Sequence, residues 1–572
     1  MALTEEQQRC RDIILSQDYG DFVVSYGGDI EVMAEIYNPS CYEKIDNNFV
    51  VIQRTLPESG QLNPDEYSYN LIPDLLGLLD TTSMEQSGIL PVHYSPASGF
   101  RGSGIIVGVI DTGIDYTHPA FRFSDGNTRI LSIWDQTIQT DQVPERFPFG
   151  TVYTRDDINA ALQAEEPLDV VPSRDENGHG TFIAGIMAGT EDQANGFIGA
   201  APEASIVAVK LKPAKQYLRD YYVIKEDAIA FQETDIMMAI EFLRSQSVRY
   251  QMPLVVCLGL GNTLDSHEGS STLSQYLNVV NNITGICVVA AAGNELGKAH
   301  NYAGVVEGRD EFDTVELRVG EGEQGFQMEI WGSLSDVFSV EIISPEGERI
   351  ARSQSRIGDS QRVNLFLEGT EIYLANRSAG LSGGQFLMVL QFRSPTPGIW
   401  TLRVYGDRIL RGRFDIWLPM EKFIQDSTYF LNPDPDITLT SVATTNSIVV
   451  TSNYNHYNDR LYVNSSRGYT SSGVIKPDIA APGVNVYGPE PGGRYGVRSG
   501  SSISAAHGAG AAALLMEWGL LRAIITNMDG NDIRRLLIQG AVQKGVDTYP
   551  NPGWGYGAMN LKNTFETLRI VR

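Results

Sequence analysis

Three short segments of the chain place a carboxylate, an imidazole and a hydroxyl among small residues. Asp111 follows the apolar run 104–110, His179 lies between two glycines, and Ser502 begins a stretch rich in serine and alanine. A serine hydroxyl is a weak nucleophile until a base removes its proton, and histidine is the usual base. A buried aspartate fixes the histidine tautomer and stabilises the imidazolium. These three residues therefore predict a catalytic triad for nucleophilic attack.

Asn294 follows the apolar run 286–292 and offers a side-chain amide at the end of a predicted strand. Such an amide can donate a hydrogen bond to the oxyanion that forms during acyl transfer. A second donor is expected at Ser502, because a predicted helix begins there and its first N–H groups have no partner within the helix. We therefore predict an oxyanion hole built from Asn294 and Ser502.

Four motifs follow one another along the chain: DTGID at 111–115, NGHGT at 177–181, AAGN at 291–294 and GSSISAAH at 500–507. The order Asp, His, Ser is that of subtilisin. Together the motifs resemble those of the subtilisin-like serine proteases, the subtilases of family S8. The resemblance implies that the acid, the histidine and the serine named above form the triad and that Asn294 supplies the oxyanion side chain.

The same resemblance extends to substrate and metal binding. It implies six substrate-binding residues, which are Gly259, Leu260, Gly261, Ala291, Ala292 and Gly293. The segment 189–199 is shorter than the calcium-binding loop of secreted subtilisins, so calcium binding there is possible but not indicated. No other metal or cofactor is expected. Ala506 stands where the family usually has proline, and a helix tolerates that exchange in its first turn.

A narrower resemblance rests on a large insertion, on the wording DTGIDYTHPAF at 111–121 and on the lack of a secretion signal. These features are similar to the Csp germination proteases of spore-forming clostridia and their relatives. The resemblance implies an N-terminal prodomain that the enzyme itself cuts near residues 75–98 and that stays bound as an intramolecular inhibitor. It also implies limited proteolysis of a zymogen, a spore-cortex hydrolase, during germination.

Predicted buried strands alternate with helices on both sides of the insertion. Continuous apolar runs at 104–110, 206–209, 254–258 and 286–292 are typical of strands covered on both faces, as in a parallel sheet. Helical segments lie between them, which indicates an α/β fold with a doubly wound, mostly parallel sheet. Functional residues gather at the C-terminal ends of such strands, so the motifs are expected to converge.

Residues 311–420 break this rhythm, because apolar and polar residues alternate in seven short runs. A period of two, with turns and without helical segments, predicts an inserted all-β jelly-roll domain. We expect this domain to pack on the core, since no long Gly/Ser or Pro linker flanks it. The predicted domains are an α+β prodomain at 1–80, a subtilase catalytic core formed by 81–310 together with 421–572, and the insert at 311–420.

The 572 residues carry 43 Lys and Arg against 70 Asp and Glu, a formal net charge of −27. This balance argues against a nucleic-acid partner, which needs clustered positive charge. No segment has the roughly 20 apolar residues that span a bilayer, so no membrane partner is expected. Four cysteines argue against a disulfide scaffold and fit a reducing compartment, and Cys10 and Cys41 lack metal-ligand spacing. Without an apolar signal segment the chain is expected to be made in the cytoplasm, and the resemblance implies association with spores.

Other chemically suggestive residues are expected to be structural: His118 and His507 as satisfied histidines, Cys257 and Cys287 as inert buried thiols, and Asp115 as a loop anchor. Two other functions fit the same sequence. One is a catalytically silent subtilase-fold sensor or scaffold in germination signalling, and the other is a β-sandwich binding protein that uses the α/β domain as a platform. The complete triad favours a serine endopeptidase that acts on protein or peptide substrates.

Overall fold

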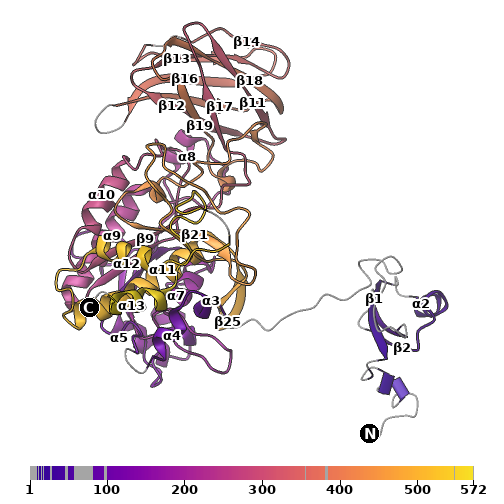
Figure 1. Cartoon of the computed structure of the whole chain (residues 1–572), viewed down its shortest axis with the longest axis vertical. Helices are drawn as coiled ribbons and strands as arrows, with labels where there is room; N and C mark the ends of the chain where they lie inside the picture. Colours follow the sequence, from indigo (N-terminus) through magenta and orange to yellow (C-terminus); the bar gives the residue numbers. More distant parts are fainter. Residues whose placement is uncertain are drawn as a thin grey trace. The chain divides into compact units, whose positions relative to one another are not determined.

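The computed structural model describes residues 9–10, 12–13, 16, 18–25, 29–44, 49–56, 82–95, 99–353, 356–379, 384–545 and 548–570. The chain divides into two compact units, Met1–Leu78 and Leu79–Arg572 (Figure 1). All four sequence motifs belong to the second unit. Among the described residues no helix is long and apolar enough to cross a membrane.

The N-terminal unit is a three-stranded antiparallel sheet, in the order β1-β3-β2, with one helix packed on it. Its elements are β1 (Tyr19–Ser25), α2 (Ile30–Tyr37), β2 (Cys41–Lys44) and β3 (Phe49–Thr55). Helix α2 begins after Asp29, whose carboxylate accepts hydrogen bonds from two N–H groups of the first turn. A disulfide joins Cys10 and Cys41, which differs from the expectation that the four cysteines fit a reducing compartment. The α+β character agrees with the sequence, and the role as a prodomain stays a prediction.

The larger unit is built on a central sheet in the order β22-β21-β9-β8-β4-β7-β5-β6. Its strands are β4 (Ile106–Asp111), β5 (Ile130–Asp135), β6 (Thr151–Thr154), β7 (Ser205–Lys210), β8 (Leu254–Leu258), β9 (Ile286–Ala291), β21 (Val449–Asn455), β22 (Arg460–Leu461) and β23 (Ile479–Pro482), which pairs with β21. The strands from β5 to β21 run parallel, whereas β6 and β22 are antiparallel edges. The predicted mostly parallel sheet is confirmed.

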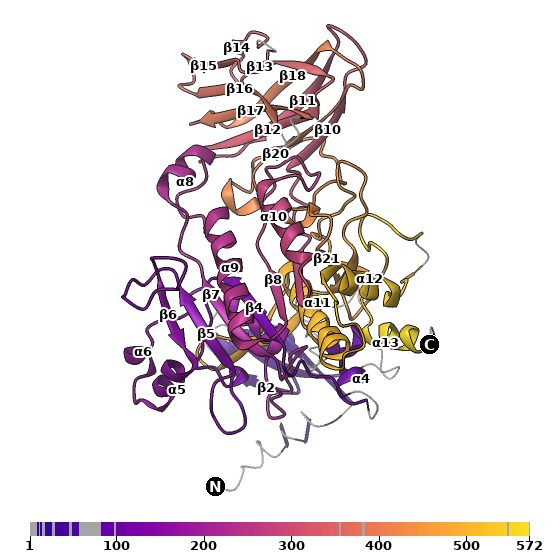
Figure 2. The same cartoon turned by 90° about the vertical axis from the view of Figure 1, so that its left-hand side faces the viewer.

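Helices cover both faces of this sheet. The helices of this unit are α3 (Thr82–Gln86), α4 (Ile89–His93), α5 (Arg155–Gln163), α6 (Pro167–Val170), α7 (His179–Ala188), α8 (Gln216–Tyr222), α9 (Glu233–Tyr250), α10 (Thr272–Asn281), α11 (Ser501–Met516), α12 (Gly530–Gly540) and α13 (Leu561–Ile570). Helix α8 lies away from the sheet (Figure 2), and its Tyr221 carbonyl accepts a hydrogen bond from Gln391 at 2.7 Å. Figure 2 shows α9 beside β4, β7 and β8. All 16 residues of α11 are buried, and their small side chains let this helix lie close to the sheet.

The strands of the sheet are apolar without alternation because both faces are covered. In β4, Val107 and Val109 pack in the layer that contains α7 and α11. Ile106 and Ile110 point the other way and pack in the layer that contains α9 and α10. Successive side chains of one strand therefore belong to two different cores, as in a doubly wound fold.

The chain between β9 and β21 forms two antiparallel sheets around a shared apolar core. One sheet has the order β10-β19-β12-β17-β16-β15 and the other the order β14-β13-β18-β11-β20. The strands are β10 (Asn301–Val305), β11 (Phe312–Val319), β12 (Gly325–Ser333), β13 (Val337–Ile343), β14 (Arg349–Ile350), β15 (Ser360–Asn364), β16 (Glu371–Ala379), β17 (Gln385–Arg393), β18 (Gly398–Arg408), β19 (Arg413–Trp417) and β20 (Tyr429–Phe430). This sandwich extends beyond the expected 311–420 at both ends, and the jelly-roll topology stays a prediction.

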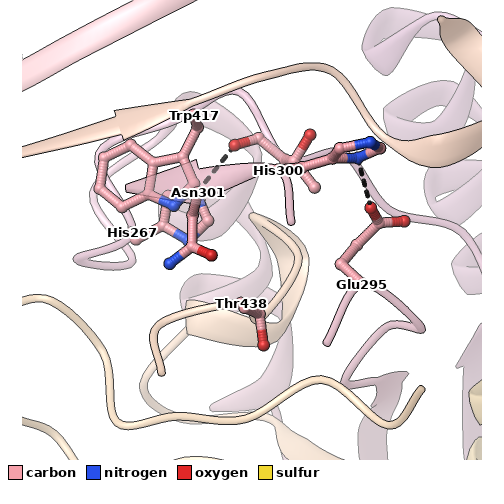
Figure 3. Close-up of a pocket in the computed structure, with 7 residues that line it drawn as sticks. His267, Glu295, His300, Asn301, Trp417 and Thr438 are labelled. Carbon is pink, nitrogen blue, oxygen red and sulfur yellow. Dashed lines mark hydrogen bonds and ion pairs between the residues drawn. The ribbon is translucent and has the colours of Figure 1, made fainter. Parts of the chain in front are cut away.

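The sandwich packs directly on the α/β domain, at one end of it (Figures 1 and 2). The His267 ring stacks on Trp417 with centroids 4.0 Å apart and an interplanar angle of 12°. Thr263 Oγ1 donates a hydrogen bond to the Leu418 carbonyl at 2.7 Å. Figure 3 shows His267 against Trp417, among the side chains that line a small pocket at this junction. Buried contacts of this kind belong to a docked domain rather than to a loosely tethered one.

Candidate active site

The three residues predicted for catalysis lie in one hydrogen-bonded row. His179 Nδ1 lies 2.8 and 2.9 Å from the two carboxylate oxygens of Asp111. His179 Nε2 lies 2.9 Å from Ser502 Oγ. Asp111 and Ser502 are buried, whereas 30% of the His179 side chain is exposed. This geometry allows the imidazole to take the serine proton while the carboxylate holds its other ring nitrogen.

The three side chains start from element ends at the same edge of the sheet. Asp111 is the last residue of β4, His179 is the first of α7, and Ser502 is the second of α11. Helix α7 approaches β4 closely through Gly180, because a Cβ there would overlap the carbonyl oxygen of Gly113. The glycine after the histidine thus permits the short distance between the histidine and the aspartate.

The charges around His179 favour its protonated form. Burial alone lowers the pKa of the imidazole, but the attraction of the Asp111 carboxylate and the hydrogen bond to it outweigh burial. The pKa of His179 therefore lies above its ordinary value. Smaller effects come from Arg498, which lowers this pKa, and from Asp175, which raises it. When His179 takes the proton of Ser502, the Asp111 carboxylate therefore stabilises the imidazolium that forms.

Asn294 lies beside the start of α11. Its Oδ1 accepts a hydrogen bond from the backbone N–H of Ser501 at 3.0 Å, which orients the side-chain amide. A Cβ placed on Gly500 would lie 3.9 Å from Asn294 Nδ2 and 3.7 Å from Ser502 Oγ. The amide donor and the serine hydroxyl therefore border the same space at Gly500, where a substrate carbonyl can be held between them.

The residue after Asn294 connects this site to the sandwich through the contact of Glu295 with His300, which Figure 3 shows. The Glu295 carboxylate lies 3.1 Å from His300 Nδ1, and both side chains are buried. The His300 carbonyl accepts a hydrogen bond at 2.8 Å from the N–H of Leu418, the residue after β19. The asparagine loop is thus held against the edge of the sandwich on which β10 pairs with β19.

Gly259, the first of the predicted substrate-binding residues, lies against the row of three side chains. A Cβ at this position would be 3.0 Å from Ser502 Cβ and 3.4 Å from His179 Cε1. The next residue, Leu260, is half-buried and packs on the apolar layer of α9 and α10. A glycine therefore keeps the space in front of the serine and the histidine open.

The other predicted substrate-binding residues meet at Thr440. A Cβ on Gly261 would lie 2.6 Å from the Thr440 side chain, and one on Gly293, where φ is +113°, would lie 2.7 Å from it. Ala291 and Ala292 are buried at the end of β9. The two glycine-rich segments thus flank the same threonine, and their contact with substrate stays a prediction.

Residues expected to be structural have structural surroundings. Both ring nitrogens of His118 and of His507 lie within hydrogen-bond distance of other groups. Cys257 and Cys287 are buried free thiols, and burial raises the pKa of both. Asp115 accepts hydrogen bonds from two backbone N–H groups of loops. Across the described ranges, no group of three or more His, Cys, Asp or Glu side chains is arranged to hold a metal ion.

One carboxylate at this site is absent from the sequence-based prediction. Asp175 is buried four residues before His179. It accepts hydrogen bonds from the N–H groups of Asn177, Gly178 and Thr181 and from the hydroxyls of Thr112 and Thr181. The sequence did contain a signal for this residue. The predicted helix at His179 begins after a glycine, which has no side chain to cap it, so an acidic residue nearby is needed as the cap.

Comparison with known proteins identifies the family. The sequence pattern of Peptidase S8, described as the subtilase family, matches residues 102–385 and 432–557, which make up more than half of the chain. The chain belongs to the subtilase family. All four motifs lie within the matched residues, so the family resemblance inferred from them is confirmed.

The similarity to individual subtilases is moderate. The structure of the Clostridium perfringens CspB protease is 31% identical, with a TM-score of 0.77, and the match covers 86% of this chain and 98% of that one. Thermitase from Thermoactinomyces vulgaris is 28% identical over 202 residues, which are 35% of this chain and 52% of thermitase. The major intracellular serine protease of Bacillus subtilis is 30% identical over 199 residues, 35% of this chain and 46% of that protein. This subtilase thus spans about half the length of the two curated relatives.

Proposed function

We propose that this subtilase is a serine endopeptidase that cleaves protein or peptide substrates through an acyl-enzyme. The observation that carries the proposal is the row of hydrogen bonds from Asp111 through His179 to Ser502, each 2.8–2.9 Å long. Family membership supports the same reaction, because these residues lie in three of the four motifs and within the residues that match the subtilase family.

In the proposed reaction, Ser502 Oγ forms a bond to the carbonyl carbon of the scissile peptide while its proton moves to His179 Nε2. Asp111 stabilises the resulting imidazolium. The charge on the substrate oxygen is met by Asn294 Nδ2 and the backbone N–H of Ser502. The imidazolium then protonates the leaving amine as the C–N bond breaks. Water attacks the acyl-enzyme by the same steps and releases the acid and the free serine.

Replacement of one serine in α11 tests this proposal against the catalytically silent alternative. Ser502→Ala should abolish peptide hydrolysis and labelling by a fluorophosphonate probe, with little change in thermal stability. Ser504→Ala is the matched control, because Ser504 lies one half-turn further along α11 and bonds to the Ala481 carbonyl at 3.1 Å. That control should keep both activity and labelling. Wild-type protein that is neither labelled nor active would favour the silent sensor or scaffold.

We further propose that the enzyme cuts off its own N-terminal unit. Residues 82–95 belong to the larger unit: Met84, Ile89 and Val92 are buried in the same core as α11, and Ser83 Oγ lies 3.1 Å from His507 Nε2. Helices held in this way cannot enter a cleft as an extended substrate, so the cut is expected before Thr82. Of the predicted interval 75–98, residues 75–81 and 96–98 lie outside the described residues.

Denaturing electrophoresis and N-terminal sequencing test the autoprocessing. The wild type should run as two pieces and Ser502→Ala as one chain of 62.9 kDa. A released fragment that remains bound should slow hydrolysis, and removing it should speed hydrolysis. An active wild type that runs uncut would refute autoprocessing and leave the peptidase proposal intact.

For the cellular substrate, we propose the zymogen of a spore-cortex hydrolase, cut once during germination. Two observations support this proposal. The structure of the Clostridium perfringens CspB protease is similar over 86% of this chain, and the sequence DTGIDYTHPAF around the first motif resembles that of the Csp proteases. Incubation with such a zymogen should give one defined cut and hydrolase activity, with Ser502→Ala as control. Degradation at many sites, or no cut, would point to another substrate.

A further inference from the structure

We propose that Asp175 is a positioning residue that holds the end of β4 and the start of α7 in the register in which Asp111 meets His179. The inference rests on the proposed peptidase function and deepens it. Asp175 lies behind the row of three side chains and acts only through its neighbours.

The start of α7 creates the need for such a residue. Its N-cap is Gly178, with φ at +82° and no side chain to accept a hydrogen bond. A Cβ at Gly178 would lie 2.7 Å from Arg498 Nη2 and 2.9 Å from Pro491 Cδ, so a larger residue would have to displace these groups and adopt a strained φ. The free N–H groups of the first turn must therefore find an acceptor elsewhere.

Asp175 supplies that acceptor with both carboxylate oxygens. Oδ2 accepts from Thr181 N and from Thr181 Oγ1, each at 2.8 Å. Oδ1 accepts from Gly178 N at 2.8 Å and from Asn177 N at 3.2 Å. These bonds surround His179 on both sides along the chain, and the carboxylate lies at the positive end of the helix dipole.

The same carboxylate also holds the other half of the pair. Asp175 Oδ1 accepts from Thr112 Oγ1 at 2.8 Å, and this hydroxyl accepts from Gly180 N at 3.1 Å. Thr112 follows Asp111 directly and donates its own N–H to the Asp111 carboxylate at 2.8 Å. One buried side chain therefore joins the residue after the aspartate to the residues on both sides of the histidine.

The charge of Asp175 gives a second, independent consequence. Three charged groups act on His179: Asp111 at the end of β4, Asp175 before α7, and Arg498 at the end of β25 (Arg494–Arg498). Arg498 is itself paired with Glu490 at 2.6 Å. Loss of the negative charge of Asp175 disfavours the imidazolium and lowers the pKa of His179. In the pH profile of kcat/KM, activity rises on the acid side as His179 loses its proton and becomes a neutral base. This rise, the acid limb, should then move to lower pH.

The test compares Asp175→Asn with Asp529→Asn. Asp529 caps α12 by accepting from Asn531 N at 2.9 Å and Asp532 N at 3.0 Å, and it lies near the beginning of β9, away from the site at the strand ends. In Asp175→Asn an NH2 group replaces one carboxylate oxygen and faces the N–H and O–H groups that donate to that oxygen in the wild type. The start of α7 should therefore shift, so kcat should fall about 10- to 100-fold with KM changed less than about twofold. Its acid limb should shift downward, and Asp529→Asn should change neither kcat nor the limb.

A milder variant keeps the proposal testable if Asp175→Asn does not fold. Thr112→Val removes one of the five bonds to Asp175 and the acceptor of Gly180 N, but it leaves the bonds from Asn177, Gly178 and Thr181 to Asp175 in place, so kcat should fall several-fold. An unchanged kcat in Thr112→Val, or an Asp175→Asn protein that loses stability while keeping kcat and the wild-type acid limb, would overturn the proposal. A wild-type protein without peptidase activity would instead refute the proposed function itself.

Discussion

Replacing Asn294 with alanine removes two interactions that have different consequences. The lost Nδ2 donor would have met the substrate oxyanion, and removal of such a donor from subtilisin, a family relative, costs about 2.7–4 kcal/mol of transition-state stabilisation. That range corresponds to a fall in kcat of about 10²- to 10³-fold. The lost Oδ1 acceptor leaves the N–H of buried Ser501 without its 3.0 Å partner, which should cost about 1–3 kcal/mol of stability. KM should change little, since the oxyanion exists only in the transition state.

Two further variants separate these effects. Asn294→Asp keeps an oxygen for Ser501 N but removes the donor and adds a negative charge, so it should lose at least as much kcat as the alanine variant. Asn281→Ala is the matched control. The Asn281 amide is buried, accepts from Val288 N at 2.8 Å and donates to the Ser447 carbonyl at 2.9 Å, towards the other end of β9. This control should lower thermal stability and leave kcat unchanged.

The assay is hydrolysis of a fluorogenic peptide at several concentrations, with the active sites titrated by a fluorophosphonate and unfolding followed in parallel. A fall in activity confined to KM would contradict the oxyanion role of Asn294. The same conclusion would follow if the two alanine variants lost kcat to a similar extent, because a general loss of stability would then explain both.

Three further predictions concern the surroundings of the site. Gly180→Ala should lower the free energy of unfolding by about 1–3 kcal/mol and should also lower kcat, because the added Cβ overlaps the Gly113 carbonyl and must push α7 away from β4. An unfolding curve and a kcat equal to those of the wild type would contradict the close approach. Burial raises the pKa of Glu329 to about 7, so the folded state binds more protons than the unfolded state and stability should fall as pH rises from about 4.5 to 7. In denaturant titrations, Glu329→Gln should raise the free energy of unfolding by up to about 3 kcal/mol above pH 7 and by little at pH 4. A stabilisation that does not depend on pH would refute this. Trp417→Ala removes the ring against His267 and should make the sandwich releasable by limited proteolysis, whereas the wild type should resist separation.

Local patterns in the sequence determined the α/β domain and the identity of the reacting groups. The continuous apolarity of β4 follows from burial on both faces, which any sequence window of that strand records. The small residues of α11 likewise record a helix buried on all sides. Asp111, His179 and Ser502 could be predicted because their side-chain chemistry and the small residues beside them are both visible within a few residues of sequence. The same reasoning places Asn294 after a strand end.

Tertiary structure alone decided what depends on contacts between distant segments. Strand β16 escaped the sequence analysis because a polar residue, the buried Asn376, follows Leu374 on its inward face, so the alternation fades although its pairing with β17 continues to Ala379. The pairing of β10 with β19 extends the sandwich beyond the predicted insert, since register between strands far apart is not encoded in either strand's period. The Cys10–Cys41 disulfide depends on the fold of the N-terminal unit.

The site itself shows the same division. The sequence names the base, the nucleophile and the acid, but it does not show which buried carboxylate holds them in register. Asp175 acquires its five donors only when the loop before α7 folds against the end of β4. Likewise, the contact of Glu295 with His300 ties the asparagine loop to the sandwich only after both domains have packed. Residue types are local information, whereas distances between hydrogen-bonding atoms of separate elements exist only in the folded chain.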